Sequence, residues 1–381
     1  MESKGFSFCL LCVFVTINLC NGSRLSYFDQ TPVKSIKGRD GDVIDCVDAS
    51  NQPAFDHPLL KNHDVQKGSS NSDSVNKLKM QSWQLDGSCP EGTITIRRTT
   101  QEDRIRANSI NSFRVSKNHG SSSSFQANSD SKPHGFFQYA TVRVEGGEYY
   151  GAKAVMNVWA PDVRLNDVSA SQVWVLGGSD SDLNAIVVGW HILPELYGDN
   201  RTRFYTYWTR DNYKSTGCYN LLCEGFVQIS NKFALGAPFH LLSNTNALEI
   251  EFSVVIFKGK NGWLLQLDDF ILGYWPYSIF TSLKNEATLI EWGGFVFNSQ
   301  IDGKQSTPTQ MGSGHFPKEG LKKASYMRQL QVVDENLKLR SLESPQPLAT
   351  QPNCYDVTLA NNKLWGDFIL YGGPGRNPNC P

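Results

Sequence analysis

The chain lacks the short motifs that mark several common enzyme classes. Its 381 residues contain no GxGxxG or phosphate-binding loop, no HExxH zinc motif and no GxSxG nucleophile motif. An excess of charge of one sign is also lacking, because 36 basic residues balance 37 acidic ones and leave a net charge of −1. These absences argue against nucleotide-dependent, zinc-peptidase and serine-hydrolase chemistry, and against a nucleic-acid partner.

Long apolar runs are nearly absent as well. The exception is Phe6–Cys20, which follows Lys4 and precedes the small residues Asn21 and Gly22. This arrangement predicts a secretion signal over residues 1–22, cleaved near Gly22. The run is too short for a comfortable membrane span, and no later stretch of about 18 apolar residues occurs. We therefore expect a secreted, extracellular or cell-wall protein that has no membrane contact once the signal is removed.

The cysteines agree with an oxidising compartment. Six cysteines follow the signal segment, an even number that favours disulfides: Cys46, Cys89, Cys218, Cys223, Cys354 and Cys380. Six cysteines allow about 15 pairings. Proximity in the sequence favours Cys46–Cys89, Cys218–Cys223 and Cys354–Cys380. The alternative, a metal site at the C-x4-C pair, lacks a second Cys or His pair nearby, so we expect no metal and no cofactor.

Composition divides the rest of the chain into three parts. Residues 23–115 hold few large apolar side chains, and such a thin core should need the support of a larger domain. Residues 116–134 are rich in Ser and Asn, which predicts a flexible, protease-accessible linker that is either a plain spacer or a processing site. Residues 135–381 form the predicted main domain.

Strand-like runs recur throughout the main domain. About ten of them, from QYATVRVEG near its start to KLWGDFILYGG near its end, alternate apolar and polar positions between Gly, Asn, Asp and Pro. Few helical patterns separate them, which predicts an antiparallel sandwich or barrel. The composition agrees, since 12% aromatic and 19% charged residues with 32 glycines suit an all-β protein.

Two of these runs carry tryptophan next to glycine. They are LNAIVVGWHILPELYGD at Leu183–Asp199 and LIEWGGFVFN at Leu289–Asn298. Together with QVWVLGG, TGCYNLLCEGFVQ and QMGSGHFPKEG, they resemble the neprosin family of secreted plant glutamic peptidases. Upstream, DCVDASNQPAFDHPLLKNH and CPEGTITIRRTT resemble that family's activation peptide. The resemblance covers nearly the whole chain after the signal.

The resemblance implies a fold, an activity and two site positions. The fold is an antiparallel β-sandwich of two stacked sheets with a concave groove, plus a small N-terminal activation-peptide-like unit. The activity is acid endopeptidase cleavage next to proline through two glutamates. In the first motif the family's glutamate stands two residues before Gly-Trp, where this chain has Val187. In the second it precedes Trp-Gly-Gly, and here it is Glu291.

The missing acid bears directly on catalysis. One carboxylate of a pair takes a proton from the attacking water, while the other, protonated, polarises the carbonyl or protonates the departing amine. Valine can do neither, and losing a general acid or base typically costs ~10²–10⁴-fold in rate. The sequence therefore favours an inactive or impaired homologue that binds a peptide, a Pro-rich protein or a cell-wall polymer. The alternative is an active acid endopeptidase that combines Glu291 with a substitute group.

The substitute has few candidates, namely Asp182, His191, Glu195, Glu249 and Glu251. On a regular strand Asp182 points away from the face of Val187, and Glu195 follows a proline that indicates a loop. His191 is the best substitute base if the strand continues through Gly-Trp. The other interpretation is a loop or surface histidine. Glu291 itself is either a groove acid or a solvent-facing strand residue, and the glycines beside it favour a crowded site.

Two softer signals remain. Asn200-Arg201-Thr202 is an N-glycosylation sequon, which predicts an exposed Asn200. Six tryptophans either line a groove or belong to the core: Trp159, Trp174, Trp190, Trp208, Trp275 and Trp292.

Overall fold

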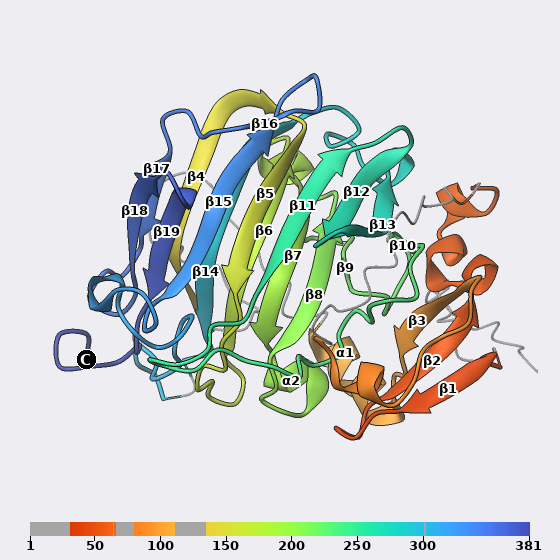
Figure 1. Cartoon of the computed structure of the whole chain (residues 1–381), viewed down its shortest axis with the longest axis horizontal. Coiled ribbons are helices and arrows are strands. Elements are labelled where there is room, and N and C mark those ends of the chain that lie inside the picture. Colours follow the sequence, from red (N-terminus) through yellow and green to blue (C-terminus); the bar gives the residue numbers. More distant parts are fainter. Residues whose placement is uncertain (1–30, 64, 66–79, 111–134, 301) are drawn as a thin grey trace, which may run out of the picture.

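The structure is a computed structural model that describes residues 31–63, 65, 80–110, 135–300 and 302–381. Three antiparallel sheets form the framework of the described chain (Figure 1). No helix in these ranges is long and apolar enough to cross a membrane. The predicted signal and the predicted linker lie outside the described residues.

The N-terminal unit is built on a three-stranded sheet. Its strands, in the order β1-β2-β3, are β1 (Lys34–Lys37), β2 (Val43–Asp48) and β3 (Thr93–Arg97). Helix α1 (Gln101–Ile110) follows the last strand. Short 3-10 turns connect the rest: Ala49–Asn51, Pro53–Asp56, Pro58–Leu60 and Ser82–Leu85.

The first large sheet has nine strands. Its order is β10-β13-β12-β11-β5-β15-β19-β18, with β16 paired to β15. The strands are β5 (Gly151–Asn157), β10 (Val227–Gln228), β11 (Glu251–Lys258), β12 (Gly262–Leu267), β13 (Phe270–Pro276), β15 (Ser325–Val333), β16 (Leu339–Arg340), β18 (Asp356–Asn362) and β19 (Gly366–Gly372).

The second large sheet has seven strands, in the order β17-β4-β14-β6-β7-β8-β9. They are β4 (Phe136–Tyr149), β6 (Val168–Gly177), β7 (Asn184–Ile192), β8 (Arg203–Thr209), β9 (Cys218–Tyr219), β14 (Ala287–Asn298) and β17 (Gln346–Ala349). The remaining helical turns are α2 (Pro194–Tyr197) and the 3-10 turns Asp180–Asp182, Tyr277–Ile279 and Pro317–Glu319.

The two large sheets stack face to face and enclose the main core (Figure 1). Tryptophans of the seven-stranded sheet tie it to β5 of the other sheet. The indole of Trp190 donates to the carbonyl of Asn157 at 2.9 Å, and that of Trp292 donates to Lys153 at 3.1 Å. Of the six tryptophans that could line a groove, all but Trp174 belong to this core. The predicted all-β sandwich with a small N-terminal unit is therefore confirmed.

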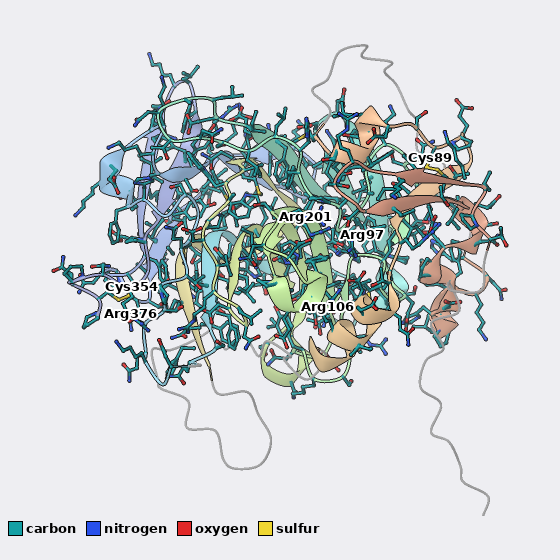
Figure 2. The ribbon with its side chains drawn as sticks, turned by 90° about the horizontal axis from the view of Figure 1, so that it is seen from below. Cys89, Arg97, Arg106, Arg201, Cys354 and Arg376 are labelled. Carbon is teal, nitrogen blue, oxygen red and sulfur yellow. A yellow bond between two sulfur atoms is a disulfide. The ribbon has the colours of Figure 1, made fainter. Side chains whose placement is uncertain are left out.

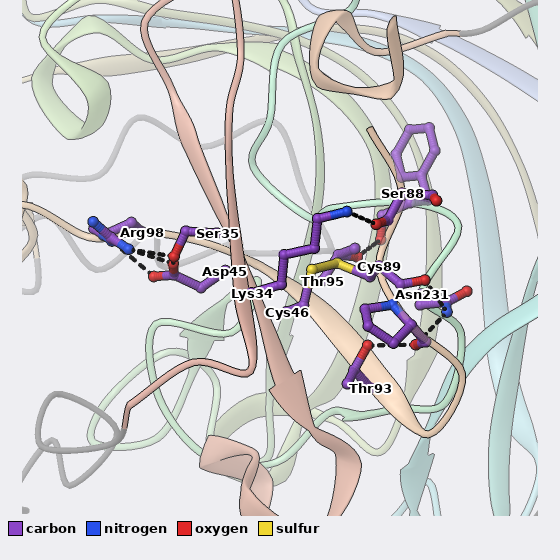
Figure 3. The surroundings of a disulfide bond; sticks show 12 residues. Lys34, Ser35, Asp45, Cys46, Ser88, Cys89, Thr93, Thr95, Arg98 and Asn231 are labelled. Carbon is purple, nitrogen blue, oxygen red and sulfur yellow. Dashed lines mark hydrogen bonds and ion pairs between the residues drawn. A yellow bond between two sulfur atoms is a disulfide. The ribbon is translucent and has the colours of Figure 1, made fainter. Parts of the chain in front are cut away.

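All three predicted disulfides are present. Cys46–Cys89, Cys218–Cys223 and Cys354–Cys380 join Cα atoms 5.4, 5.8 and 5.4 Å apart. The first bridge lies within the N-terminal unit, where the amide of Asn231 from the main domain donates to the carbonyl of Cys89 at 3.1 Å (Figure 3). The segment that carries this disulfide is therefore also hydrogen-bonded to the main domain.

The N-terminal unit shares the core of the main domain, as its thin core predicted. Its Val47, Ile94 and Ile96 pack within the main hydrophobic cluster. Gln81 is fully buried, and its carboxamide both donates to the carbonyl of Ala234 at 2.8 Å and accepts from the Ala234 amide at 2.9 Å. A buried side chain that mimics a strand partner in this way leaves the main-chain groups of the larger domain satisfied.

Arginines and aspartates form a network across the same boundary, and Figure 2 labels two of its members, Arg97 of the N-terminal unit and Arg201 of the main domain. Arg203 of β8 is 0% exposed and donates to Asp42 of the N-terminal unit and to Asp199, both at 2.7 Å. The same Asp42 carboxylate accepts from Arg97 at 3.0 Å and from Arg201 at 3.3 Å. A buried guanidinium needs a counter-charge. Asp42 of the N-terminal unit supplies it to Arg203 of the main domain.

Candidate active site

Strand register places Glu291 and Val187 in one row across the seven-stranded sheet. Glu291 of β14 pairs with Trp174 of β6, Trp174 pairs with Val187 of β7, and Val187 pairs with Tyr207 of β8. Residues paired directly across antiparallel strands point to the same face. At ~4.8 Å between strands, the two Cα atoms lie about 10 Å apart, with Trp174 between them.

This row lies on the face that points away from the nine-stranded sheet. The alternate residues Val173 and Val188 belong to the core between the sheets, whereas Trp174 and Val187 belong to a separate cluster. Glu291 is nevertheless buried, with 1% of its surface exposed. The interpretation of Glu291 as a solvent-facing strand residue is therefore wrong, and the crowded surroundings predicted from the adjacent glycines are present.

Aromatic and aliphatic side chains surround Val187. We call this set the outer cluster: its buried members are Ala170, Trp174, Leu176, Leu183, Ala185, Val187, Tyr205 and Tyr213, with Tyr139, Tyr207, Tyr219, Leu289 and Phe295 packed against them. The neighbouring acid by register is Glu145, opposite Leu289 on β4, but it is exposed and pairs with Arg143 at 3.4 Å. The position of the missing glutamate is thus apolar.

Tyr213 reaches this cluster from the loop after β8. Its backbone φ of 61° is rare for an aromatic residue, and Asn212 before it has a φ of 54°. The loop is held by the Asp211 carboxylate, which accepts from the amides of Ser215 and Thr216 at 2.8 and 3.0 Å. The Tyr213 ring stacks on Tyr207 at 5.7 Å, beside the Val187 row. Backbone strain retained at such a place is a feature of functional sites.

Two phenols lie within electrostatic reach of Glu291. Burial raises the pKa of Tyr139 well above its ordinary value, and the charge of Glu291 adds to this effect. Burial likewise raises the pKa of Tyr213, with a further contribution from Glu291. Both hydroxyls therefore stay protonated at neutral and acid pH, which leaves them as hydrogen-bond donors within electrostatic reach of the carboxylate.

His191 differs from the loop or surface histidine considered from the sequence. The strand continues through Gly-Trp, so His191 lies within β7 on the face of Val187, and it is 1% exposed. Its Nε2 lies 3.0 Å from the hydroxyl of Tyr197, and its ring stacks on Tyr205 at 3.8 Å. Burial, with the nearby charge of Arg203, lowers the pKa of His191 well below its ordinary value. Burial therefore favours the neutral form of the imidazole.

None of the other candidate substitutes lies on a strand of the Val187 face. Glu251 belongs to β11 in the other sheet and accepts from Arg328 at 3.0 Å, and Glu249 precedes the same strand. Asp182 lies in a 3-10 turn before β7 and not on the strand itself. Glu195 is in the one-turn helix α2, where a loop was expected, because the proline before it favours the first helical position.

A polar row next to that of Glu291 escaped the sequence reasoning. Gln172 of β6 pairs with Gly293 on one side and Gly189 on the other, and Thr141 pairs with Gly293 from β4. Gln172 is 3% exposed and Thr141 is fully buried. The sequence did show that Gln172 and Trp174 of QVWVLGG share one face of their strand. It did not show that this strand lies between the strands that carry the two Gly-Trp motifs.

Two remaining expectations concern glycosylation and metals. Asn200 is exposed at the surface, as its sequon predicted, and its side-chain amide donates to the carbonyl of Val163 at 3.1 Å. Glycosylation itself stays a prediction. Within the described ranges, no group of three or more His, Cys, Asp or Glu residues is placed to hold a metal ion.

Comparison with known proteins identifies two matching family models. The model described as Neprosin matches residues 165–374, and the model described as Neprosin activation peptide matches residues 35–143. The second match extends beyond the predicted linker into β4 of the seven-stranded sheet.

Solved structures give weaker likenesses. Scytalido-glutamic peptidase with a transition state analog inhibitor is 10% identical over 63% of this chain and 100% of its own, with a TM-score of 0.35. SCP-B, a member of the Eqolisin family of peptidases in a complex with the tripeptide Ala-Ile-His, is 9% identical over 63% and 100%, with a TM-score of 0.32. A tetrameric galectin from the ball sponge Cinachyrella sp. is 12% identical over 42% and 88%, with a TM-score of 0.23. The family assignment rests on the two sequence models.

Proposed function

Because this chain belongs to the neprosin family, we propose that it is a secreted peptide-binding homologue whose glutamic-endopeptidase activity is lost or strongly reduced. The observation that carries this proposal is the placement of Val187 in one row with Glu291, on an apolar and aromatic face. The position that the family resemblance assigns to the first glutamate holds no group that can give or take a proton.

A single catalytic carboxylate leaves half of the reaction undone. Glu291 can act as the base for water or as the acid for the leaving amine, but one group cannot fill both roles in the same step. The tyrosine hydroxyls near it stay protonated, so they can donate hydrogen bonds but cannot serve as the base. Groups that act as a unit lose activity far from additively when one is removed. We therefore expect peptide binding on this face with little turnover.

Secretion has independent chemical support. Three disulfides fit an oxidising compartment, in agreement with the predicted signal over residues 1–22. The ligand class proposed here is a peptide, including Pro-rich proteins, and a cell-wall polymer is the alternative ligand.

One observation favours a competing function, an active acid endopeptidase. Tyr213 sits on a strained backbone beside Val187, and its buried phenol is electrostatically coupled to Glu291. A phenol in that position could donate a hydrogen bond to the scissile carbonyl while Glu291 acts as base. This function predicts turnover that disappears in both Glu291→Gln and Tyr213→Phe.

The deciding experiment restores the missing acid. Val187→Glu is compared with the parent chain and with Val187→Gln, which has the same length but no titratable proton. Hydrolysis of an internally quenched proline-containing peptide is followed from pH 3 to 7. We expect only Val187→Glu to gain acid-dependent turnover, about 10²–10⁴-fold over the parent, and Val187→Glu/Glu291→Gln to lose it.

Turnover by the parent chain that depends on Glu291 would refute the proposal and favour the competing function. Each measurement is made before and after cleavage at a protease site inserted within residues 111–134, which tests whether the covalent tether to the N-terminal unit restrains activity.

A further inference from the structure

The row beside Glu291 has an unusual composition of two glycines around one glutamine. Gln172 faces Gly293 across β14 and Gly189 across β7, so no side chain flanks it within its row. It is also the diagonal neighbour of both Glu291 and Val187, which lie two residues further along those strands. Diagonal neighbours on one face have Cα atoms ~7–8 Å apart, within reach of a long side chain.

The sheet backbone requires both glycines. A Cβ atom at residue 189 would lie 2.0 Å from the carbonyl oxygen of Ser171. A Cβ atom at residue 293 would lie 2.4 Å from the carbonyl oxygen of Ala140, at a backbone φ of 141°. Glycine within a strand commonly marks a place where another backbone approaches closely. The two residues therefore keep side chains away from both flanks of Gln172.

Two buried acceptors in this row are unsatisfied within the described chain. The Oε1 atom of Gln172 and the Oγ1 atom of Thr141 form no hydrogen bond there, although the two residues are 3% and 0% exposed. Buried polar atoms are nearly always satisfied, so an unsatisfied pair on one face points to donors that come from another molecule. Such donors have to reach the face from outside the sheet, because the strands on either side present only glycine to Gln172.

We propose that Gln172 binds the main chain of a peptide ligand beside Glu291. A carboxamide offers one acceptor and two donors in a plane, which matches a peptide unit. Its Oε1 accepts from a peptide N–H and its Nε2 donates to the carbonyl of the ligand, while Thr141 accepts a second N–H. This inference rests on the proposed function and deepens it, since it names the ligand's amide backbone as the group that is recognised.

Peptide chemistry fits this row better than a polysaccharide does. A peptide presents amide N–H and C=O groups at regular intervals, and the glycines allow its backbone to lie close to the sheet. The aromatic side chains of the outer cluster then contact its apolar residues. Because Gln172 is buried, a peptide reaches it only when neighbouring side chains move aside.

The test uses the full chain and a fluorescein-labelled, uncharged octapeptide with a central proline, measured by fluorescence anisotropy. A second set of probes carries one backbone N-methyl group each, which removes one donor at a time. Gln172→Leu and Gln172→Met are compared with the wild type. The matched control is Gln346→Leu, an exposed glutamine on β17 of the same sheet.

We expect both Gln172 variants to bind the octapeptide about tenfold more weakly, and Gln346→Leu to bind it as the wild type does. One N-methylated probe should lose about tenfold on the wild type and nothing further on the Gln172 variants, since that N–H is the partner of Oε1. If one variant fails to fold, the other variant and the N-methyl series on the wild type carry the test.

The outcomes separate this inference from the proposed function. No binding of any peptide by the wild type, cut or uncut within residues 111–134, refutes the proposed function and this inference with it. Peptide binding that is equal in wild type and Gln172 variants refutes the inference alone. The inference also fails if no N-methylated probe is selectively weakened, or if soluble xylan and not the peptide binds in a Gln172-dependent way.

Discussion

Asp42→Asn tests how firmly the N-terminal unit is held to the main domain. Asp42 is 8% exposed and accepts from Arg203, which is 0% exposed, at 2.7 Å. Removing one partner of a buried ion pair leaves the other charge uncompensated and costs about 3–5 kcal/mol. Asparagine keeps part of the hydrogen bonding, so we expect a loss of about 3 kcal/mol in the free energy of unfolding at pH 7.

The pH dependence of this loss follows from the pKa of Asp42. Burial alone would raise that pKa, but Arg203 and Arg97 lower it by more, so the folded value lies below the ordinary one. A lowered pKa stabilises the fold above the unfolded value of about 3.9 and ceases to do so as the pH falls through the folded value. Asp199, which also pairs with Arg203, has a lowered pKa because Arg203 and Arg201 outweigh the effect of burial.

The assay is urea unfolding of wild type and Asp42→Asn, followed by tryptophan fluorescence between pH 7 and pH 2.5. The difference between the two proteins should be full at pH 5 to 7 and shrink below about pH 4, since the Asp42 carboxylate then takes up a proton, first in the unfolded and at lower pH in the folded wild type. Asp86→Asn is the control, because Asp86 pairs with the exposed side chain of Arg39. A difference that does not change with pH, or that is no larger than in the control, would contradict the reasoning.

Two further predictions concern processing and packing. Acidification of the purified full-length chain should leave it uncut on gels, because self-cleavage needs both catalytic carboxylates; fragments that disappear in Glu291→Gln would oppose this. Trp190→Phe should lower the free energy of unfolding by about 1–3 kcal/mol, since it removes the indole donor to the carbonyl of Asn157 on β5. An unchanged thermal midpoint would show that this hydrogen bond between the sheets contributes little.

The sequence was sufficient for the features that depend on local pattern. Alternating apolar residues predicted strands such as β6 and β7, because side chains on a strand repeat every two residues. Proximity predicted all three disulfides, since each pair is separated by a short segment. The thin core of the N-terminal part also predicted that it packs against the main domain.

The candidate site could not be predicted in full from the sequence, because it depends on which strands are neighbours in the sheet. Gln172 gains its meaning only because β6 lies between β14 and β7, and β14 comes more than a hundred residues later in the chain. The place of His191 stayed open because the sequence does not show whether a strand continues through Gly-Trp, and it does so here because Gly189 allows close approach of β6. Tyr213 gives no periodic signal at all, since its position depends on a loop with positive φ angles.

The reciprocal bonds of Gln81 with Ala234 have a consequence for any maturation of this protein. Cutting the chain between the two units removes a covalent link. It leaves in place the shared core, the hydrogen bonds of Gln81 and the ion pair of Arg203 with Asp42. Such a cut would therefore yield two chains that stay associated. The residues before the cut would remain bound to the sandwich and would not dissociate from it.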